Sequence, residues 1–194
     1  MNDKANYKLL LASGSPRRAD ILKIARIPFD VHPVRVDESF IGNDPSLNAR
    51  RIAGLKAREA VDIFGTSLPV LAADTFIYKE PYLIGKPADR EDAERILRLF
   101  SGTAHFVYTG YCIYDPAADS YTDGCEITKI EFLPLSEDDI VRYLSSGEWK
   151  DAAGGYRIQG YGACYINSIT GSFHNVMGLP IHRIYGILRR INFF

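Results

Sequence analysis

The chain has 194 residues, of which 46% are hydrophobic and 24% charged, and its formal net charge is -1. This length and composition are typical of one globular domain, with or without two lobes. The near-zero net charge excludes a strongly basic nucleic-acid coat and a polybasic membrane binder. We therefore expect neither nucleic acid nor a membrane as a partner.

The cysteines and the first apolar run indicate the cellular compartment of the protein. Cys112, Cys125 and Cys164 form no C-x-x-C pair, and no histidine stands near them at zinc-ligand spacing. The apolar run 9–12 is shorter than the core of a signal peptide or of a transmembrane helix. We expect a cytoplasmic protein with reduced thiols.

Strand and helix signals alternate through the first half of the chain. Pro16 suits the first turn of a helix, and Ser15 suits the N-cap position before it. Residues 69–73 form a compact apolar run, which is typical of a buried central strand that ends at Asp74 and Thr75. The other elements predicted in this half are strands over 7–12 and 29–36 and a helix over 47–64.

The second half adds capped helices and long strands. Asp89 can cap a helix over 90–100, and Ser136 with Asp139 has capping-box spacing for a helix over 137–145 that Gly147 ends. After a turn-rich stretch through Lys86, the other predicted elements are strands over 105–114 and 121–132, a hairpin of 161–167 with 172–176, and a helix over 180–191. Because crossovers and hairpins occur together, we predict an α/β fold with a mixed sheet.

The first candidate site is the strand-to-helix turn S-G-S-P-R-R at residues 13–18. The hydroxyls of Ser13 and Ser15, with the first N–H groups of a helix, can hold phosphate oxygens. Arg17 and Arg18 add forked donors that match phosphate geometry. The pattern fits an anion site, and it equally fits an ordinary capped helix with two solvated arginines.

The second candidate is the pair Asp74 and Thr75 after the buried run. Ligand-binding and catalytic groups gather at the ends of central strands in open α/β sheets. A carboxylate there can bind a metal or activate water, whereas the alternative is an aspartate that caps the following turn. Taken singly, Lys56 and Lys86 are typical of solvated lysines.

The glycine-rich segment 154–162 carries one amide, Gln159. It does not match the dinucleotide fingerprint, and Gly85-Lys86 is no Walker A motif because Pro87 follows. The default interpretation of this segment is a structural turn cluster. The sequence contains neither the H-E-x-x-H motif of zinc proteases nor the G-x-S-x-G motif of serine hydrolases.

These scattered features occur together in a known family. The chain resembles the Maf family of nucleoside triphosphate pyrophosphatases, also described as septum-formation inhibitors. The resemblance spans residues 9 to about 184. The matching segments are LLASGSPRR (10–18), VDES (36–39), IAGLKA (52–57), ADT (73–75), GKP (85–87), YTG (108–110), SGE (146–148), AGGYRIQGYG (153–162), GS (171–172) and VMGLP (176–180).

The resemblance implies a reaction and a fold. Family members cleave a nucleoside triphosphate between the α and β phosphates, giving the monophosphate and pyrophosphate, with a divalent cation such as Mg²⁺ or Mn²⁺. The implied fold is one Maf-like domain over residues 1–194, with a mixed elongated sheet, two lobes and a central cleft, similar to the inosine triphosphatase group. Dimers are common in the family, so a homodimer is implied as one assembly.

The resemblance also implies roles for individual residues. Asp74 matches the catalytic acid or base, and Glu38 matches an acidic position that shares the metal with Asp74. Lys56 and Lys86 match catalytic cations. The substrate-binding positions implied are Ser13, Ser15, Arg17, Arg18, Thr75 and Gln159.

Base preference follows from the same comparison. Arg17, Thr75 and Gln159 match positions that mark the family's dTTP and UTP subgroup, and the amide of Gln159 offers the donor and acceptor that a uracil or thymine edge requires. The chain departs from the family at Thr103-Ala104, Leu133 and Ala152. The alternative function is a nucleotide-binding regulator of cell division without significant turnover.

Overall fold

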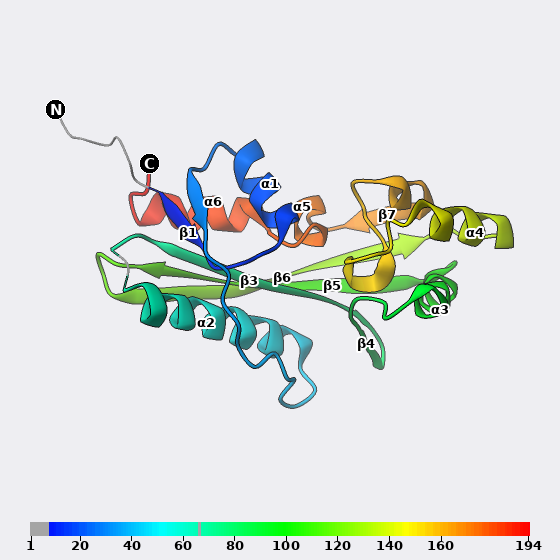
Figure 1. Cartoon of the computed structure of the whole chain (residues 1–194), viewed down its shortest axis with the longest axis horizontal. Helices are drawn as coiled ribbons and strands as arrows, with labels where there is room; N and C mark the ends of the chain where they lie inside the picture. Colours follow the sequence, from blue (N-terminus) through cyan, green and yellow to red (C-terminus); the bar gives the residue numbers. More distant parts are fainter. Residues whose placement is uncertain (1–7, 66) are drawn as a thin grey trace. The chain divides into compact units, whose positions relative to one another are not determined.

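The computed structural model describes residues 8–65 and 67–194. Tyr7, the first residue of the predicted strand 7–12, lies outside the described residues. The helices are α1 (Pro16–Ile24), α2 (Pro45–Phe64), α3 (Arg90–Phe100), α4 (Glu137–Ser146), α5 (Phe173–Val176) and α6 (Ile181–Arg190) (Figure 1). The strands are β1 (Leu9–Leu11), β2 (Phe29–Val31), β3 (Val70–Lys79), β4 (Tyr82–Ile84), β5 (Ala104–Asp115), β6 (Ser120–Phe132) and β7 (Ile166–Thr170).

The strands form a mixed sheet of seven strands in the order β2-β1-β3-β5-β6-β7, with β4 paired to β3. β1 lies parallel to β2 and to β3, with Leu10 opposite Val70 and Leu11 opposite Leu71. β4 runs antiparallel to β3, and β7 runs antiparallel to β6. The predicted α/β fold with a mixed sheet flanked by helices is confirmed.

Contacts between residues group the chain into two compact units. The first unit holds the chain up to Asp74, together with Thr109–Glu126 and Gly178–Phe194. The second unit holds Thr75–Tyr108 and Ile127–Met177. The boundary between Asp74 and Thr75 falls inside β3, and the prediction of one Maf-like domain with two lobes stays a prediction.

In the first unit, α2 covers one face of the sheet, and α1 and α6 cover the other (Figure 1). The buried side of α2 includes the small residues Ala49, Ala53 and Ala57. A Cβ on Gly110 of β5 would lie 1.9 Å from the carbonyl oxygen of Ala49, so only glycine fits this contact. The close approach also fixes Lys56, which lies about two turns further along α2.

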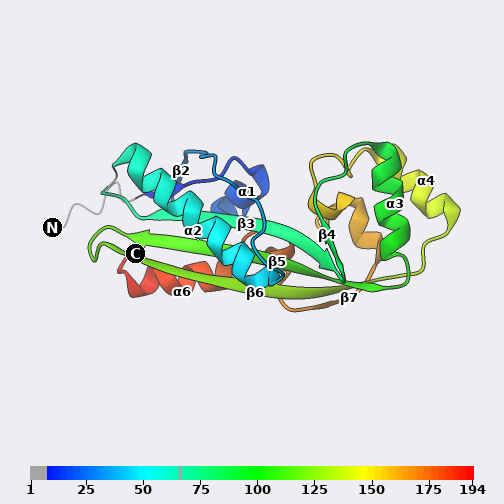
Figure 2. The ribbon, with the colours of Figure 1, turned by 90° about the horizontal axis from the view of Figure 1, so that it is seen from below.

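The core of the second unit is aromatic. His105 is fully buried, with its ring centroid 4.0 Å from that of Phe100 and its Nε2 2.8 Å from the hydroxyl of Tyr156. Phe132 packs against His105 and Phe100. α3 contacts α4 and the 3-10 turn Ala153–Gly155 (Figure 2).

Several helix ends follow the predicted signals. Asp89 caps α3, and Ser136 and Asp139 form the predicted capping box of α4. Gly147 ends α4 in the left-handed conformation, with φ 72°. No helix within residues 8–65 and 67–194 has both the length and the apolar character that crossing a membrane requires.

Two predicted strand boundaries are wrong, and one strand was not predicted. β2 ends at Val31 rather than at residue 36, because its neighbour β1 is three residues long and offers no further partner. β3 does not end at residue 73 but runs on to Lys79. The turn-rich stretch before Lys86 contains β4, which pairs with the far end of β3 and so extends it.

The predicted hairpin of 161–167 with 172–176 is also wrong. Tyr161–Tyr165 forms a 3-10 turn, and the strand that follows, β7, pairs with β6 rather than with a hairpin partner. Ser172 instead begins α5, where its hydroxyl accepts the N–H of Asn175 at 3.2 Å. A capping serine therefore overrides the strand signal over 172–176.

Candidate active site

The turn that enters α1 brings Ser13 and Arg18 together. Arg18 Nη1 donates to Ser13 Oγ at 2.8 Å, and Arg18 Nε donates to the carbonyl of Gly178 at 2.8 Å. Ser15 stands at the N-cap position, but its hydroxyl makes no capping hydrogen bond; its N–H lies 3.3 Å from Ser13 Oγ. Ser13 and Arg18 are both buried, so the alternative of a solvated arginine fails for Arg18.

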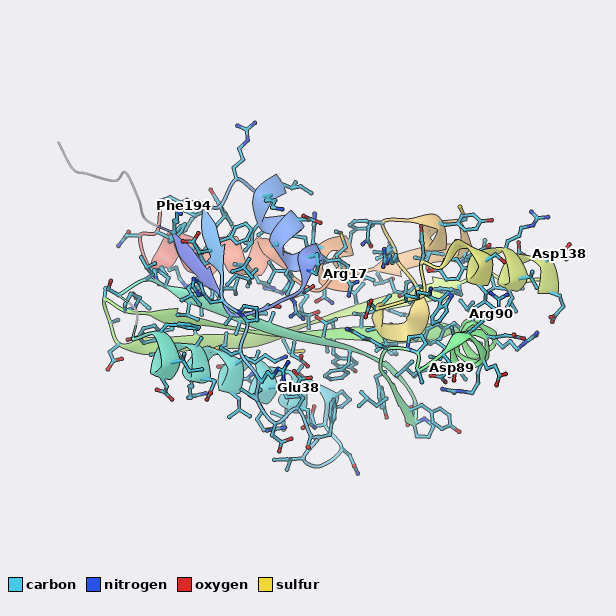
Figure 3. The ribbon with its side chains drawn as sticks, in the orientation of Figure 1. Arg17, Glu38, Asp89, Arg90, Asp138 and Phe194 are labelled. Atoms are coloured by element: carbon cyan, nitrogen blue, oxygen red, sulfur yellow. The ribbon has the colours of Figure 1, made fainter. Side chains whose placement is uncertain are left out.

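Arg18 lies within electrostatic reach of two carboxylates. Burial lowers the pKa of its guanidinium, the charges of Asp74 and Glu38 oppose this lowering, and the charge of Arg17 adds to it. A guanidinium stays charged because its ordinary pKa lies far above neutral. Figure 3 shows Arg17 at the start of α1. Arg18 thus contributes permanent positive charge near the two acids, and Arg17 is its neighbour in α1.

Lys56 joins the same two acids. Its Nζ is 2.7 Å from Asp74 Oδ1 and 2.6 Å from Glu38 Oε1. The side chains of Lys56 and Asp74 are 10% and 15% exposed, whereas that of Glu38 is 57% exposed. The ion-pair cluster is therefore anchored in the protein on one side and open to solvent at Glu38, as a ligand site requires.

The segment that carries Glu38 is tied to the start of α2 (Figure 3). The buried side chain of Asn48 accepts the N–H of Ile41 at 2.8 Å and donates to the carbonyls of Ile41 and Asp44 at 3.1 and 2.9 Å. Asp44 in turn caps α2, accepting the N–H of Ser46 at 2.8 Å. These contacts hold Glu38 against the helix that bears its partner lysine.

Asp74 lies within β3, so its predicted place at the end of the strand is wrong. Asp74 nevertheless lies beyond the end of a neighbouring strand, because the parallel strand β1 ends at Leu11, opposite Leu71. On the side of β1, β3 therefore has no parallel partner at Asp74. Among the described residues, Asp74 Oδ1 bonds to Lys56 while Oδ2 makes no hydrogen bond.

The acids of this cluster fit a hard divalent cation. Carboxylate oxygens are the ligands Mg²⁺ and Mn²⁺ prefer, and Mg²⁺ is usually held by one or two carboxylates together with substrate phosphates and water. Asp74 and Glu38 supply two such carboxylates at one lysine nitrogen. Across residues 8–65 and 67–194, no group of three or more acids, histidines or cysteines forms a metal cage.

The remaining predicted site residues belong to the second unit. Thr75 follows Asp74 in β3. Lys86 follows β4, and its Nζ lies 3.7 Å from a carboxylate oxygen of Asp151, with both side chains largely exposed. Gln159 is exposed on the turn between the two 3-10 segments, and its side chain makes no hydrogen bond within the described ranges. The glycine-rich segment is a turn cluster, as expected.

Three supporting residues escaped the sequence reasoning. Gly178 supplies a carbonyl to Arg18, a role that the match of segment 176–180 to the family does not indicate. Asn48 anchors the Glu38 segment through bonds that no spacing rule reveals. Glu148 binds the turn that carries Gln159. The second unit also has a depression of 390 Å³ along residues 102–104, 131–134 and 167, which includes none of the predicted site residues.

The protein is thus of mixed α/β fold and holds a buried lysine that is paired with two carboxylates. The family model described as Maf-like protein matches residues 8–191. The chain belongs to this family.

The chain is also similar to named relatives. The chain is 42% identical over 189 residues to a dTTP/UTP pyrophosphatase of Aquifex aeolicus (strain VF5), covering 95% of this chain and 96% of the relative. It is 46% identical over 177 residues to a dTTP/UTP pyrophosphatase of Pyrococcus furiosus, covering 90% of each. Among solved structures, a HAM1 protein from Coxiella burnetii matches at a TM-score of 0.47 and 18% identity, over 66% of this chain and 73% of that one.

Proposed function

We propose that the protein hydrolyses dTTP and UTP to the nucleoside monophosphate and pyrophosphate. The observation that carries the proposal is the cluster in which Lys56 Nζ lies 2.7 Å from Asp74 and 2.6 Å from Glu38. The names of the relatives, dTTP/UTP pyrophosphatases, supply the reaction and the bases. A pure binding protein would have no use for a carboxylate placed to accept a proton.

Asp74 is the proposed base. Its Oδ1 accepts a hydrogen bond from Lys56, and its Oδ2 is the oxygen that we propose accepts the proton of a water molecule. The water oxygen bonds to the α phosphorus, one water proton passes to Asp74, and the bond between the α phosphorus and the oxygen that bridges it to the β phosphorus breaks. The electron pair of that bond leaves with pyrophosphate, so atoms and charge balance.

Cationic side chains hold the triphosphate and its developing charge. Ser13 and Arg18 form the rigid part of this set because both are buried and bonded to each other. Arg17, at the same helix start, and Lys86, which is exposed, are the proposed adaptable contacts. Such groups raise the rate where they meet charge that builds on phosphate oxygens.

Asp74 and Glu38 are the residues that would hold a divalent cation, Mg²⁺ or Mn²⁺. Such an ion supplies electrostatic stabilisation to phosphate oxygens when it is bound. Lys56, which bridges the two carboxylates, keeps them close together and limits their mutual repulsion. The site is thereby preorganised for a cation.

Gln159 is the proposed reader of the base, with Thr75 and Arg17 as the other subgroup positions. Its amide is exposed and makes no hydrogen bond within the described part of the chain, so both its donor and its acceptor are available to a pyrimidine edge. A glutamate there offers only acceptors at neutral pH. Gln159→Glu should therefore weaken turnover of dTTP and UTP relative to other nucleotides.

A pyrophosphate-release assay with Mg²⁺ or Mn²⁺ and a panel of nucleoside triphosphates tests the proposal. We expect dTTP and UTP to be cleaved fastest, and Asp74→Asn to slow turnover about a hundredfold or more, the usual worth of a general base. The matched control is Asp123→Asn, which removes a carboxylate paired with Arg50 in the same unit. No cleavage of any nucleotide, or full activity of Asp74→Asn, would contradict the proposal.

We propose two further properties, a homodimer as the assembly and the cytoplasm as the cellular compartment. The dimer rests on the family resemblance, and the compartment rests on the unpaired cysteines and the short first apolar run. Sedimentation equilibrium of the full chain measures the first, and a mass of 21.7 kDa at all concentrations would exclude the dimer. Fractionation of the cells that make the protein measures the second.

A further inference from the structure

The turn that bears Gln159 is held at both ends. On one side, the hydroxyl of Tyr143 accepts the N–H of Arg157 at 3.1 Å. On the other side, Glu148 Oε2 accepts the N–H of Tyr161 at 2.8 Å. Gln159 lies between these two anchored residues, so its backbone has little freedom to move while its side chain stays exposed.

The Glu148 carboxylate lies directly over the residue after Gln159. A Cβ on Gly160 would lie 2.4 and 2.7 Å from the two carboxylate oxygens of Glu148 and 2.8 Å from its Cδ. The φ of Gly160 is -127°, which other residues adopt freely, so the glycine is needed for space rather than for its backbone conformation. The sequence pair Glu148 and Gly160 therefore forms one packed contact.

The rest of the anchor is rigid. Tyr143 is fully buried, and its ring packs with those of Tyr161 and Tyr165, at centroid distances of 6.1 and 5.8 Å. Burial raises the pKa of the Tyr143 hydroxyl, so the group stays neutral across the physiological range. Glu148 itself follows Gly147, the residue that ends α4. The turn is thus fastened to the end of a capped helix.

Base discrimination needs such a fixed turn. A primary amide carries both a donor and an acceptor, so by rotating it can match either uracil or cytosine. Discrimination then depends on which ring atoms the amide reaches, and hence on where the turn holds it. A charged acceptor such as Glu148 makes a stronger hydrogen bond to a backbone N–H than a neutral group does.

We propose that Glu148 is a positioning residue for base selection, acting through the N–H of Tyr161 and the space over Gly160 to fix Gln159. The inference rests on the proposed function in one respect, that Gln159 reads the base. It adds a specificity determinant that touches no substrate. Glu148 and Gln159 would then act as one unit in choosing uracil or thymine over cytosine.

Calorimetric titration of the full chain with UMP and with CMP tests the inference without turnover. We expect Glu148→Ala to reduce the preference for UMP over CMP about tenfold, in line with the loss of one charge-assisted hydrogen bond. Glu148→Gln keeps an acceptor of the same length and should retain most of the preference. Gly160→Ala should behave like Glu148→Ala because its methyl group displaces the carboxylate.

The double variant and a control complete the test. In Glu148→Ala the space over Gly160 is open, so adding Gly160→Ala should cost little more selectivity. Glu131→Gln removes the ion pair with Lys129 on β6 in the same unit and should leave the UMP to CMP ratio unchanged. An unchanged ratio in Glu148→Ala, or a wild-type protein that binds the two nucleotides equally, would overturn the inference. A protein that prefers UMP but releases no pyrophosphate would contradict only the proposed reaction.

Discussion

Acid should destabilise the second unit through His105. This ring is fully buried against Phe100 and Tyr156, and its Nδ1 has no hydrogen-bond partner in the described part of the chain. Burial lowers the pKa of His105 to about 3, with a smaller contribution from the charge of Lys79. The native protein therefore holds this imidazole neutral under conditions where an unfolded chain would protonate it.

The sign and the size of the effect follow from linkage. The folded pKa lies below the ordinary value of 6.5, so between pH 6.5 and 3 the unfolded chain binds more protons and stability falls as the pH falls. Each pH interval of one in this window costs about 1.4 kcal/mol. At pH 5 the loss is about 2 kcal/mol relative to pH 7.5, where His105 is neutral in both states.

Urea unfolding at pH 7.5 and 5.0, followed by the fluorescence of Trp149, measures this loss. Trp149 is the chain's one tryptophan, and it belongs to the same unit as His105. pH 5.0 lies above the ordinary pKa values of 3.8 and 4.5 of the carboxyls whose pKa is lowered by hydrogen bonds, for example Asp92 and Glu131. The contributions of these carboxylates to the free energy of unfolding are lost mainly at lower pH, so they change little between pH 7.5 and 5.0.

His105→Gln is the informative variant because its side chain can still bond to Tyr156 but does not titrate in this range. Whatever its stability at pH 7.5, its loss between pH 7.5 and 5.0 should be smaller than that of the wild type by about 2 kcal/mol. His174→Gln removes a half-buried histidine of the same unit and should keep the wild-type loss. An equal loss in His105→Gln and wild type would refute the assignment of the effect to His105.

Three further variants test the first unit. Lys56→Met leaves the carboxylates of Asp74 and Glu38 without the lysine that separates their charges. It should lower the free energy of unfolding in urea by about 1–3 kcal/mol, less than the loss from a fully buried ion pair, because Glu38 is exposed and Arg18 remains. It should also lower the rate of pyrophosphate release about a hundredfold. Gly110→Ala places a methyl group on the backbone of α2 and should cost about 3 kcal/mol or more, whereas Gly186→Ala, at an open position in α6, should be neutral or stabilising. Asn48→Ala removes the ties to Ile41 and Asp44 and should raise the KM for UTP more than it lowers kcat, because it loosens the Glu38 segment; an unchanged KM would contradict that role.

Local sequence signals predicted most of the helices, but they failed for segments whose structure depends on the pairing of strands. Asp89, Ser136 and Gly147 act within a few residues of themselves, so their spacing in the sequence suffices to place α3 and α4. The length of β3 depends instead on β4, a three-residue strand with no clear sequence signature. Residues 172–176 had apolar spacing suited to a strand, but a serine cap and the pairing of β7 with β6 settled them as a helix.

In the candidate site, too, contacts between residues close in the sequence were predictable and contacts between distant residues were not. Ser13 and Arg18 are five residues apart, and their meeting was foreseeable from one helix start. The contact between Lys56 and Asp74 joins α2 to β3, and only the family resemblance suggested it. The bond from Arg18 to Gly178 spans 160 residues, and no pattern in a single sequence carries that information.

The net charge of the whole chain does not show the balance of opposite charges in the cluster around Lys56. Lys56 and Arg18 are positive, and Asp74 and Glu38 offset them, so this part of the site adds almost nothing to the net charge of -1. A neutral cluster attracts a polyanion weakly as long as its lysine is engaged by its own acids. An anionic ligand gains the full attraction of Lys56 and Arg18 only if the acids are neutralised by something else, and a divalent cation bound to them has the required charge. For the proposed function, we therefore expect nucleotide and divalent cation to bind this cluster together more tightly than either one alone.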